Sequence, residues 1–413
     1  MKIEMVEGIR TLQLDMIATL ALAAVLLMLG YFIRDKVKLL DRLCIPAPVI
    51  GGLLFSLIVW VFRLTDLLVI NMDITLQLPF MLTFFTCVGF GGSFKLLKSG
   101  GRLLIVFLVS CWILAIIQNV VGVSLASALG LNPVLGVMAG TVSLVGGHGN
   151  AAAFGPVAES LGVEGATTVA VASATFGLIA GSLIGGPIGN WLIKKNKLEI
   201  KTDDTVEGKQ EIKKERVIEK DDFTVKSFLS HLTLIFVFMF GGIVISDLVA
   251  MLGIKNFALP NYVGAMFLAI IFRNINDKTN MFEMNFKEVN IIMEVGLSFF
   301  LTMATMTLKI WELADLAAPL LILLFVQLII VILFSIFVVF RMLGKSYDSA
   351  VMTGGYAGWG LGISATAVVC MSAICEKYDL KSTKAFLIVP LCGAVFVDIV
   401  AVPIIIFFIT KFA

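Results

Sequence analysis

The sequence is poor in charged residues and in histidine, and these shortages exclude several classes of protein. Of its 413 residues, 15% are charged and 59% are hydrophobic, whereas soluble domains contain about 25% charged residues. A soluble core could not bury so much apolar surface. The 31 Lys and Arg nearly balance the 29 Asp and Glu, so net charge gives no indication of a nucleic-acid partner. With two histidines far apart and no convergent set of nucleophile, base or metal ligands, an enzyme is not expected.

Cysteine pairs and a cleavable leader are also missing. The six cysteines lie in or beside apolar stretches without a Cys-x-x-Cys pair, so we interpret them as small buried hydrophobic residues. An apolar run from Met16 to Ile33 has no small-residue cleavage site and is too long for a signal-peptide core. We expect this run to remain as a membrane span.

Long apolar stretches dominate the rest of the chain. A helix needs about 20 mainly apolar residues to cross a bilayer. Ten stretches fit this length, at 15–33, 45–62, 76–94, 103–129, 167–193, 229–252, 260–274, 289–308, 317–341 and 384–411. Two further apolar segments, near 134–162 and 348–375, are rich in Gly, Ala, Ser and Thr and contain motifs that break helices. We expect these two to be re-entrant hairpins instead of full spans.

A charged segment divides the chain into two similar halves. Residues 194–226 contain ten Lys or Arg and nine Asp or Glu, which is typical of a solvated linker. The halves 1–193 and 227–413 each contain five predicted spans and one Gly-rich segment before the last span. The tetrapeptide VMAG at 137–140 recurs 214 residues later as VMTG at 351–354. The pattern predicts an internal repeat.

The odd number of spans in each half predicts that the two repeats have inverted topology, because the second half must enter the membrane from the opposite side. The predicted fold is therefore an all-α polytopic membrane protein of ten transmembrane helices in two inverted five-helix repeats. With both termini outside and the linker in the cytoplasm, 25 of the 31 Lys and Arg lie inside. This bias agrees with the positive-inside rule.

The Gly-rich segments surround polar or aromatic residues with glycine. The first reads GGHGN at 146–150, and the second reads GGYAGWGLG at 354–362. Neither can be a continuous lipid-facing helix, because glycine destabilises helices and freed backbone groups need partners away from lipid. Neither is a nucleotide-binding loop, because the spacing is wrong and no Gly-Lys-Ser/Thr follows.

Through the inversion, the two broken segments would bring their tips together near the bilayer midplane. Half-helices that begin there present unpaired N–H groups and a partial positive charge, which suit a carboxylate, and freed carbonyls suit a small cation. The alternative role for such glycines is close helix packing. We expect packing for Gly181, Gly185 and Gly189, which repeat every four residues in one span.

A few polar residues lie deep within the predicted spans, where they are costly. Asp398 has no Lys or Arg in its own segment, and we expect it to meet a sodium ion or a substrate ammonium group, with a structural hydrogen bond as the alternative. Thr175 occupies the matching place in the other repeat and is a candidate hydroxyl ligand. Gln118 and Asn119 in one repeat and Gln327 in the other are polar amides at roughly equivalent places, and they either bind a ligand or bridge helices. His148 either handles protons or makes a hydrogen bond at a helix tip.

At these residues the sequence resembles the bacterial sodium/glutamate symporter family, and the likeness runs over nearly the whole chain. The matches are GGHG at 146–149, ATFGL at 174–178 with GGP at 185–187, LKIWELA at 308–314, GWGLG at 358–362, and Gly393 with DIV at 398–400.

The resemblance implies uptake of glutamate driven by a sodium gradient, through an elevator-like movement in which a core carrying both hairpins slides against a static scaffold. It also implies a homodimer in the bacterial inner membrane and no cofactor beyond the coupling sodium. The expected substrate-binding residues are Gly146, Gly147, His148, Gly149, Asn150, Tyr356, Gly358, Gly360, Gly362, Thr175 and Asn119. The expected sodium ligands are Asp398, Ser143, Thr366 and Gln327.

Two departures from the family concern specificity. The family's second loop has a small His-Cys pair where this chain has Tyr356 and Ala357, and Asn150 follows the first GGHG motif. Another acidic amino acid or a dicarboxylate is therefore an alternative substrate. An ion channel is less favoured, because it would need charged or carbonyl rings contributed by several subunits.

Overall fold

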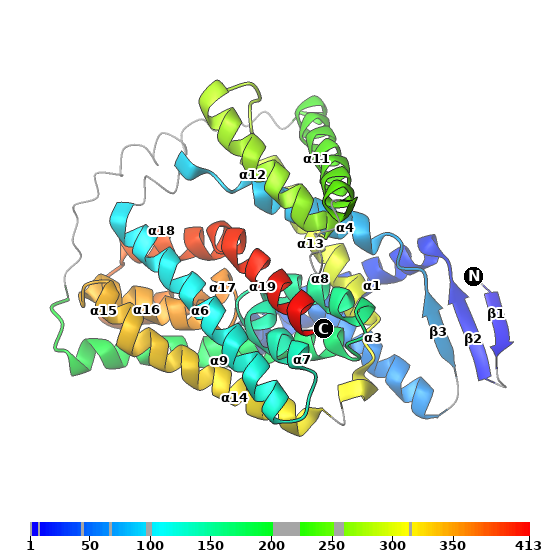
Figure 1. The fold of residues 1–413 in the computed structure, drawn as a ribbon, viewed down its shortest axis with the longest axis horizontal. Helices are drawn as coiled ribbons and strands as arrows, with labels where there is room; N and C mark the ends of the chain where they lie inside the picture. The colour runs from blue at the N-terminus through cyan, green and yellow to red at the C-terminus, as the bar shows by residue number, and fades with distance from the viewer. Residues whose placement is uncertain are drawn as a thin grey trace.

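The computed structural model describes residues 2–6, 9–42, 45–65, 68–95, 101–200, 224–251, 260–313 and 316–413, and helices form most of this chain (Figure 1). Most of the predicted charged linker, residues 201–223, lies outside the described residues. The elements in chain order are β1 (Lys2–Val6), β2 (Ile9–Leu14), α1 (Met16–Lys36), α2 (Lys38–Arg42), α3 (Ala47–Leu64), β3 (Val69–Met72), α4 (Gln77–Phe90), α6 (Gly101–Ala128), α7 (Pro133–Val137), η1 (Met138–Val142), α8 (Gly147–Ser160), α9 (Ala166–Lys195), α11 (Val225–Met251), α12 (Asn261–Thr279), α13 (Phe286–Met306), η2 (Ile310–Leu313), α14 (Ala317–Phe334), η3 (Ser335–Val339), α15 (Phe340–Met342), α16 (Tyr347–Trp359), α17 (Ser364–Tyr378), α18 (Thr383–Leu391), η4 (Cys392–Phe396) and α19 (Asp398–Phe412).

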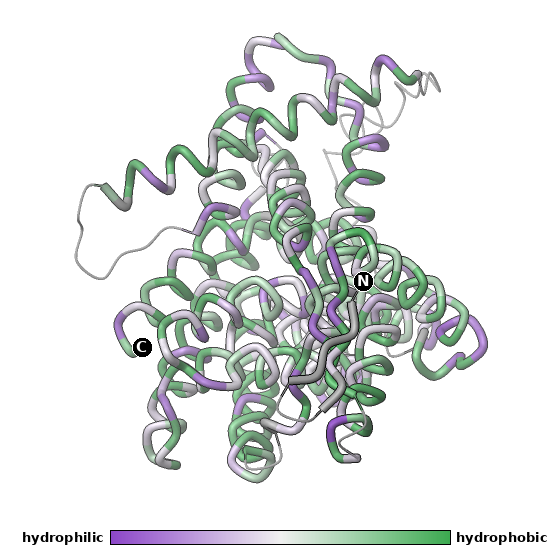
Figure 2. The backbone as a smooth tube through the Cα atoms, turned by 90° about the vertical axis from the view of Figure 1, so that its right-hand side faces the viewer, coloured by the Kyte–Doolittle hydropathy of each residue, from purple (hydrophilic) through white to green (hydrophobic). Residues whose placement is uncertain are grey.

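The protein is a multi-pass membrane protein. Within the described ranges, seven helical runs are long and apolar enough to cross a bilayer, namely α1, α3, α6, α9, α11, α13 and the run of α14, η3 and α15. Hydrophobic residues colour most of the helical path, and hydrophilic residues gather at turns and helix ends (Figure 2). Each of the ten stretches predicted to span the membrane coincides with helix.

Three of the ten predicted spans do not reach the length and composition of a full crossing. Helix α4 has 14 residues, about 21 Å at 1.5 Å per residue, whereas the hydrocarbon core is about 30 Å thick. Helix α12 carries Arg273, Asp277 and Lys278 within its last turns. The final run is divided into α18 and α19 by the wide turns of η4. Apolar content alone does not reveal where a helix ends or widens, so these three stretches stay predicted spans.

The helices pack as two groups, and each group draws on both halves of the chain. In the first group, α1 packs on α3, α11 packs on α12, and α4 and α13 join these pairs. The second group contains α6 to α9 and α14 to α19, with α9 packed against α8, α16 and α17. Helix α13 meets α8, and η2 meets α9, at the boundary between the groups.

A stripe of glycines on α9 lets α16 approach its backbone closely. The glycines at 177, 181, 185 and 189 face the carbonyl oxygens of residues 361, 358, 354 and 350 in that order. A Cβ at Gly181 would lie 2.9 Å from the Gly358 oxygen, closer than real Cβ contacts. The packing role predicted for Gly181, Gly185 and Gly189 is therefore confirmed. The stripe presses the second broken segment onto the same helix that carries Thr175.

A small three-stranded sheet departs from the all-helical prediction. Strands β1 and β2 pair antiparallel, with Lys2 opposite Gln13, and β2 pairs parallel with β3, with Thr11 opposite Val69. The sheet lies beside the start of α1, near the N-terminus (Figure 1). Ile70 and Met72 of β3 pack against the apolar cluster around Met303. Strands of four to six residues escape an analysis based on spans of about 20 residues.

Candidate functional site

The first Gly-rich segment is a broken helix. Pro133 starts α7, where the Asn132 side chain accepts a hydrogen bond of 2.9 Å from the Val134 amide, which caps the helix. The chain then widens into η1, kinks at Gly140 and starts again as α8 at Gly147. Gly147 has a φ of +62°, in the left-handed region that favours glycine. The helix break predicted from the GGHG motif is confirmed.

The second Gly-rich segment is broken at the matching place. Helix α16 ends at Trp359 and α17 begins at Ser364, and residues 360–363 form a turn between them. The two helices pack against each other. Neither α16 nor α17 reaches the length of a full membrane crossing, because they have 13 and 15 residues respectively.

The tips of the two broken segments meet. A Cβ added at Gly147 would contact the Ile363 side chain and lie 4.0 Å from the Gly362 carbonyl oxygen. On α9, Gly177 faces the Leu361 carbonyl oxygen. The approach of the two tips, which the repeat pattern predicts, is therefore present in the fold.

Two amide side chains tie the breaks to α6 and α14. Gln118 Nε2 donates to the Gly360 carbonyl oxygen at 3.1 Å, and Gln327 Nε2 donates to the Gln118 carbonyl oxygen at 2.8 Å. Thr141 Oγ1 donates to the Ala115 carbonyl oxygen at 2.8 Å. These bonds fulfil the helix-bridging role that the sequence left open for Gln327. Gln118 bridges helices in the same way, and Thr141 is a positioning residue that the sequence pattern does not reveal.

His148 is held in one orientation by Thr175. The Nε2 atom of His148 lies 3.0 Å from Thr175 Oγ1, and the Thr175 hydroxyl donates to the Val171 carbonyl oxygen at 3.0 Å. If the Thr175 hydroxyl donates to Val171, then Nε2 carries the ring proton and donates to Thr175. The Nδ1 atom is buried and has no partner among the described residues. The structure thus brings together two candidate site residues, His148 on α8 and Thr175 on α9.

Several other buried polar atoms near the breaks lack hydrogen-bond partners within the described part of the chain. They are Asn119 Oδ1 and Nδ2, Gln327 Oε1, Ser335 Oγ and Thr366 Oγ1. A buried polar group without a partner costs about 1–3 kcal/mol, so a native structure rarely keeps several together unless water, an ion or a ligand satisfies them. Ser335 belongs to η3, and no sequence pattern marks a widened helical turn, so it was not predicted.

Asp398 begins α19 directly after the wide turns of η4. Its carboxylate is partly buried and interacts with the side-chain amide of Asn150 in the first broken segment. No cationic side chain pairs with it in the part of the molecule that is described. The structure therefore brings together Asp398 and Asn150, which were assigned to different ligands.

Other predicted residues have local structural partners. Tyr356 donates from its hydroxyl to the Ser110 carbonyl oxygen at 2.8 Å, and its ring packs against Phe107 and Trp359. Ser143 donates to backbone carbonyl oxygens, among them that of Ala170 at 2.7 Å. The remaining predicted glycines also make close contacts: Gly146 faces the Asn150 side chain, Gly149 faces Phe84, Gly358 faces Cys370 and Gly360 faces Leu114.

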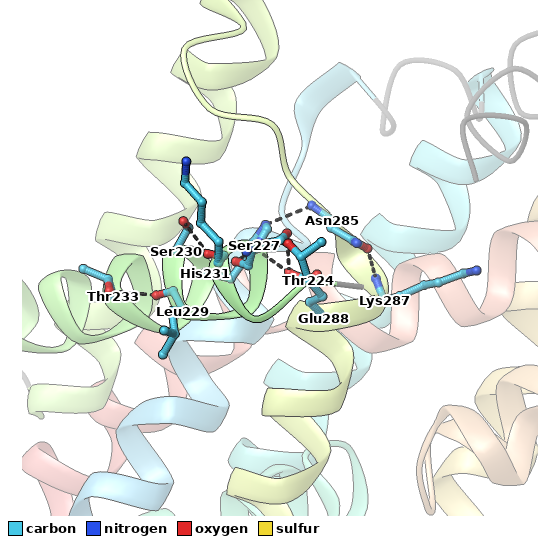
Figure 3. Close-up of polar contacts among 10 residues, drawn as sticks. Thr224, Ser227, Leu229, Ser230, His231, Thr233, Asn285, Lys287 and Glu288 are labelled. Atoms are coloured by element: carbon cyan, nitrogen blue, oxygen red, sulfur yellow. Dashed lines mark hydrogen bonds and ion pairs between the residues drawn. The ribbon is translucent and has the colours of Figure 1, made fainter. Parts of the chain in front are cut away.

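A second buried polar cluster joins α11 to α13 (Figure 3). His231 Nδ1 lies 2.7 Å from Glu288 Oε2, and Ser227 Oγ donates to the same carboxylate oxygen at 2.9 Å. The backbone amide of Asn285 donates to His231 Nε2 at 3.0 Å. The serine bonds to the carboxylate and not to the imidazole, so the order needed for a nucleophilic triad is missing. The cluster positions the start of α11 against α13.

Comparisons with known proteins agree with this architecture. The model of a family described as sodium/glutamate symporter matches residues 12–380. The chain belongs to this family. It is 39% identical over 392 residues to the sodium/glutamate symporter of Escherichia coli (strain K12), covering 94% of this chain and 95% of that protein. It is 38% identical over 384 residues to the sodium/glutamate symporter of Haemophilus influenzae, covering 92% of this chain and 94% of that protein. The family is one of transporters and not of enzymes.

Proposed function

We propose that the protein is a sodium-coupled symporter that imports glutamate by alternating access. The observation that carries this proposal is the meeting of two broken helices beside buried polar atoms that have no partner among the described residues. Such discontinuous helices suit an anionic substrate and a coupling cation at one place. Family membership supports glutamate and sodium as the transported pair.

The substrate carboxylates are proposed to bind at the start of α8. The first amides of this helix, from Gly147 onward, have no intrahelical acceptors and carry a partial positive charge. His148, Asn150 and Asn119 supply side-chain polar atoms around this point. We keep Thr175 and the glycines at 146, 149, 358, 360 and 362 in the proposed site as its walls, and Tyr356 as their support.

Sodium is proposed to bind Asp398 together with neutral oxygens near the second break. Thr366 Oγ1 and Gln327 Oε1 are buried acceptors without partners within the described chain. Ser143 uses its hydroxyl proton in a backbone bond, which leaves oxygen lone pairs that can face a cation. Asn150, which contacts Asp398, would then couple the sodium site to the substrate site.

The proposed inverted repeats are supported by matching helix crossings. Gly30 of α1 approaches the backbone of α3, and Gly51 of α3 approaches the backbone of α1. In the second half, Gly242 of α11 and Gly264 of α12 make the corresponding crossing. The two pairs are displaced by 212 and 213 residues, close to the 214 residues between VMAG and VMTG. We propose that the ten helical stretches form two inverted five-helix repeats with the broken segments as re-entrant hairpins.

We propose that the two helix groups are the moving core and the static scaffold of an elevator-like transporter. Both broken segments and Asp398 lie in the second group, which we propose as the moving core. The first group, with α1, α3, α4 and α11 to α13, would be the scaffold and would carry the homodimer contact. We propose that both termini lie outside a bacterial inner membrane and that the linker is cytoplasmic.

The decisive experiment is uptake of labelled glutamate into proteoliposomes of the purified protein, with and without an inward sodium gradient. We expect uptake that depends on sodium and is reduced by excess unlabelled glutamate. Uptake that persists when potassium replaces sodium would contradict the proposed coupling of glutamate uptake to sodium. Competition by aspartate or succinate but not by glutamate would show that the substrate is another acidic amino acid or a dicarboxylate.

A further inference from the structure

A cavity of about 450 Å³ lies between the two helix groups. Its walls come from α4, α12 and the end of α13 in the first group, and from α8 and the start of α9 in the second. Small-molecule sites commonly have volumes of about 300–1,000 Å³. The cavity therefore has room for an amino acid, and its walls belong to both groups proposed to move against each other.

The cavity wall contains buried polar atoms that need partners. Gln77 Oε1, Thr167 Oγ1 and Tyr262 Oη line it and have no hydrogen-bond partner in the described chain. The Tyr262 side chain is 2% exposed, and its ring is fixed between Phe85 and Phe154. A packing defect between apolar side chains would not be lined by three buried polar atoms without partners. The wall is suited to a polar occupant.

One acidic and one basic side chain line the same cavity. Glu159, at the end of α8, accepts a hydrogen bond of 3.0 Å from the Thr167 amide, which fixes its carboxylate at the wall. Lys309 follows the end of α13 and lines the cavity from the first group. The pair offers an anionic partner for an ammonium group and a cationic partner for a carboxylate. An amino acid with an acidic side chain presents both.

The cavity is connected to the candidate site by α8. The helix begins at the break with Gly147, His148 and Asn150, and its next turn supplies Ala152 and Ala153 to the cavity wall. Thr167 and Thr168 at the start of α9 also line the cavity, and the other end of this 30-residue helix leads toward residues 201–223. The cavity therefore lies toward the end of α9 that is opposite the linker.

We propose that this cavity is the chamber in which the acidic amino acid docks on the outer side before it reaches the broken helices, with Lys309 and Glu159 as its docking residues. The inference rests on the proposed function. It adds a separate docking step on the outer face, at residues that do not touch the break. Electrostatic steering by Lys309 would raise the local concentration of a substrate with net negative charge.

The first test compares uptake kinetics of Lys309→Gln and Lys309→Arg with Lys411→Gln as the matched control. Lys411 lies at the end of α19 and does not line the cavity. We expect Lys309→Gln to raise KM about tenfold at low ionic strength with kcat unchanged, and the increase to shrink in high salt, because steering is screened. Lys309→Arg and Lys411→Gln should keep the wild-type KM. A normal KM in Lys309→Gln, with intact sodium-dependent uptake by the wild type, would overturn the docking proposal alone.

The second test places a single accessible cysteine in the cavity with Val157→Cys on α8. The described native cysteines are buried, so the wild type is the control for background labelling. A membrane-impermeant thiol reagent should label Val157→Cys from outside right-side-out vesicles, and glutamate with sodium should slow the labelling. Labelling from the inner side only, or labelling that glutamate does not affect, would overturn the proposal. Absence of sodium-driven glutamate uptake by the wild type would instead overturn the proposed function.

Discussion

The two broken helices resemble each other in sequence but differ in what they offer a ligand. The first break carries His148 Nδ1, a buried polar atom with no partner in the described chain, and Asn150, whose side-chain amide contacts Asp398. In the second break, Tyr356 donates to Ser110 and the Gly360 carbonyl accepts from Gln118. The polar groups at the tip of the second break are therefore satisfied within the protein, and Thr366 Oγ1 on the following helix, α17, is a buried atom beside it that has no partner among the described residues.

This difference suggests that one break recognises the substrate and that the other supports the structure of the site. A buried polar group that is left unsatisfied costs stability, so the unpaired His148 Nδ1 of the first break indicates one place where a ligand completes the structure. The second break presses its backbone against the glycine stripe of α9, and its aromatic residues fill the core around it. We infer that the first break discriminates between substrates and that the second break sets the geometry. The predictions below test this division from the largest expected effect to the smallest.

The largest effect on transport is expected for Asp398→Asn, because the Asp398 carboxylate is a proposed sodium ligand and contacts Asn150 of the first break. Hydrogen bonds to a charged group contribute about 1.5–3 kcal/mol, which corresponds to a loss of about tenfold or more in apparent sodium affinity. The measurement is glutamate uptake as a function of sodium concentration. Glu294→Gln is the matched control, because Glu294 is exposed on α13 in the first group. Normal sodium dependence of Asp398→Asn would make the residue structural.

The second prediction tests the support given by the glycine stripe. In Gly177→Ala, the new Cβ would overlap the Leu361 carbonyl oxygen, and such overpacking typically costs about 1–3 kcal/mol. We expect lower thermal stability in detergent and reduced uptake. Gly186→Ala on the same helix is the control, because the nearest atom to its Cβ, in Ala373, would be 3.9 Å away. Equal behaviour of the two variants would contradict the close approach of α9 to the second break.

The sequence contained enough to predict the helical stretches, the two breaks and the packing role of Gly181, because spans and glycine motifs follow from composition and spacing alone. It could not indicate that Gln118 bonds to Gly360, since the two residues are 242 positions apart and only the fold brings them together. The widened turn that carries Ser335 and the short strand β3 also leave no clear pattern in the sequence. The contact between Asp398 and Asn150 was out of reach for the same reason.

The third prediction concerns substrate recognition by the first break. His148→Ala removes the hydrogen bond to Thr175 and the unpaired Nδ1 atom. A neutral hydrogen bond contributes about 0.5–1.5 kcal/mol, so we expect a loss of stability of about this size, together with a rise in KM for glutamate of up to about tenfold because Nδ1 is lost as a substrate partner. Thr175→Val tests whether the orientation of the ring matters, and it should raise KM in the same direction. A fall in stability without a change in KM would place His148 among the supporting residues.

The smallest effect on transport is expected for Tyr356→Phe in the second break. The variant keeps the ring packing against Phe107 and Trp359 and loses only the bond to the Ser110 carbonyl oxygen. We expect a loss of about 1 kcal/mol in stability, measured by thermal unfolding in detergent, and an unchanged KM for glutamate. A change in KM with preserved stability would assign Tyr356 a direct contact with the substrate. Because Tyr356 stands where the family's second loop differs, that result would also move substrate discrimination from the first break to the second.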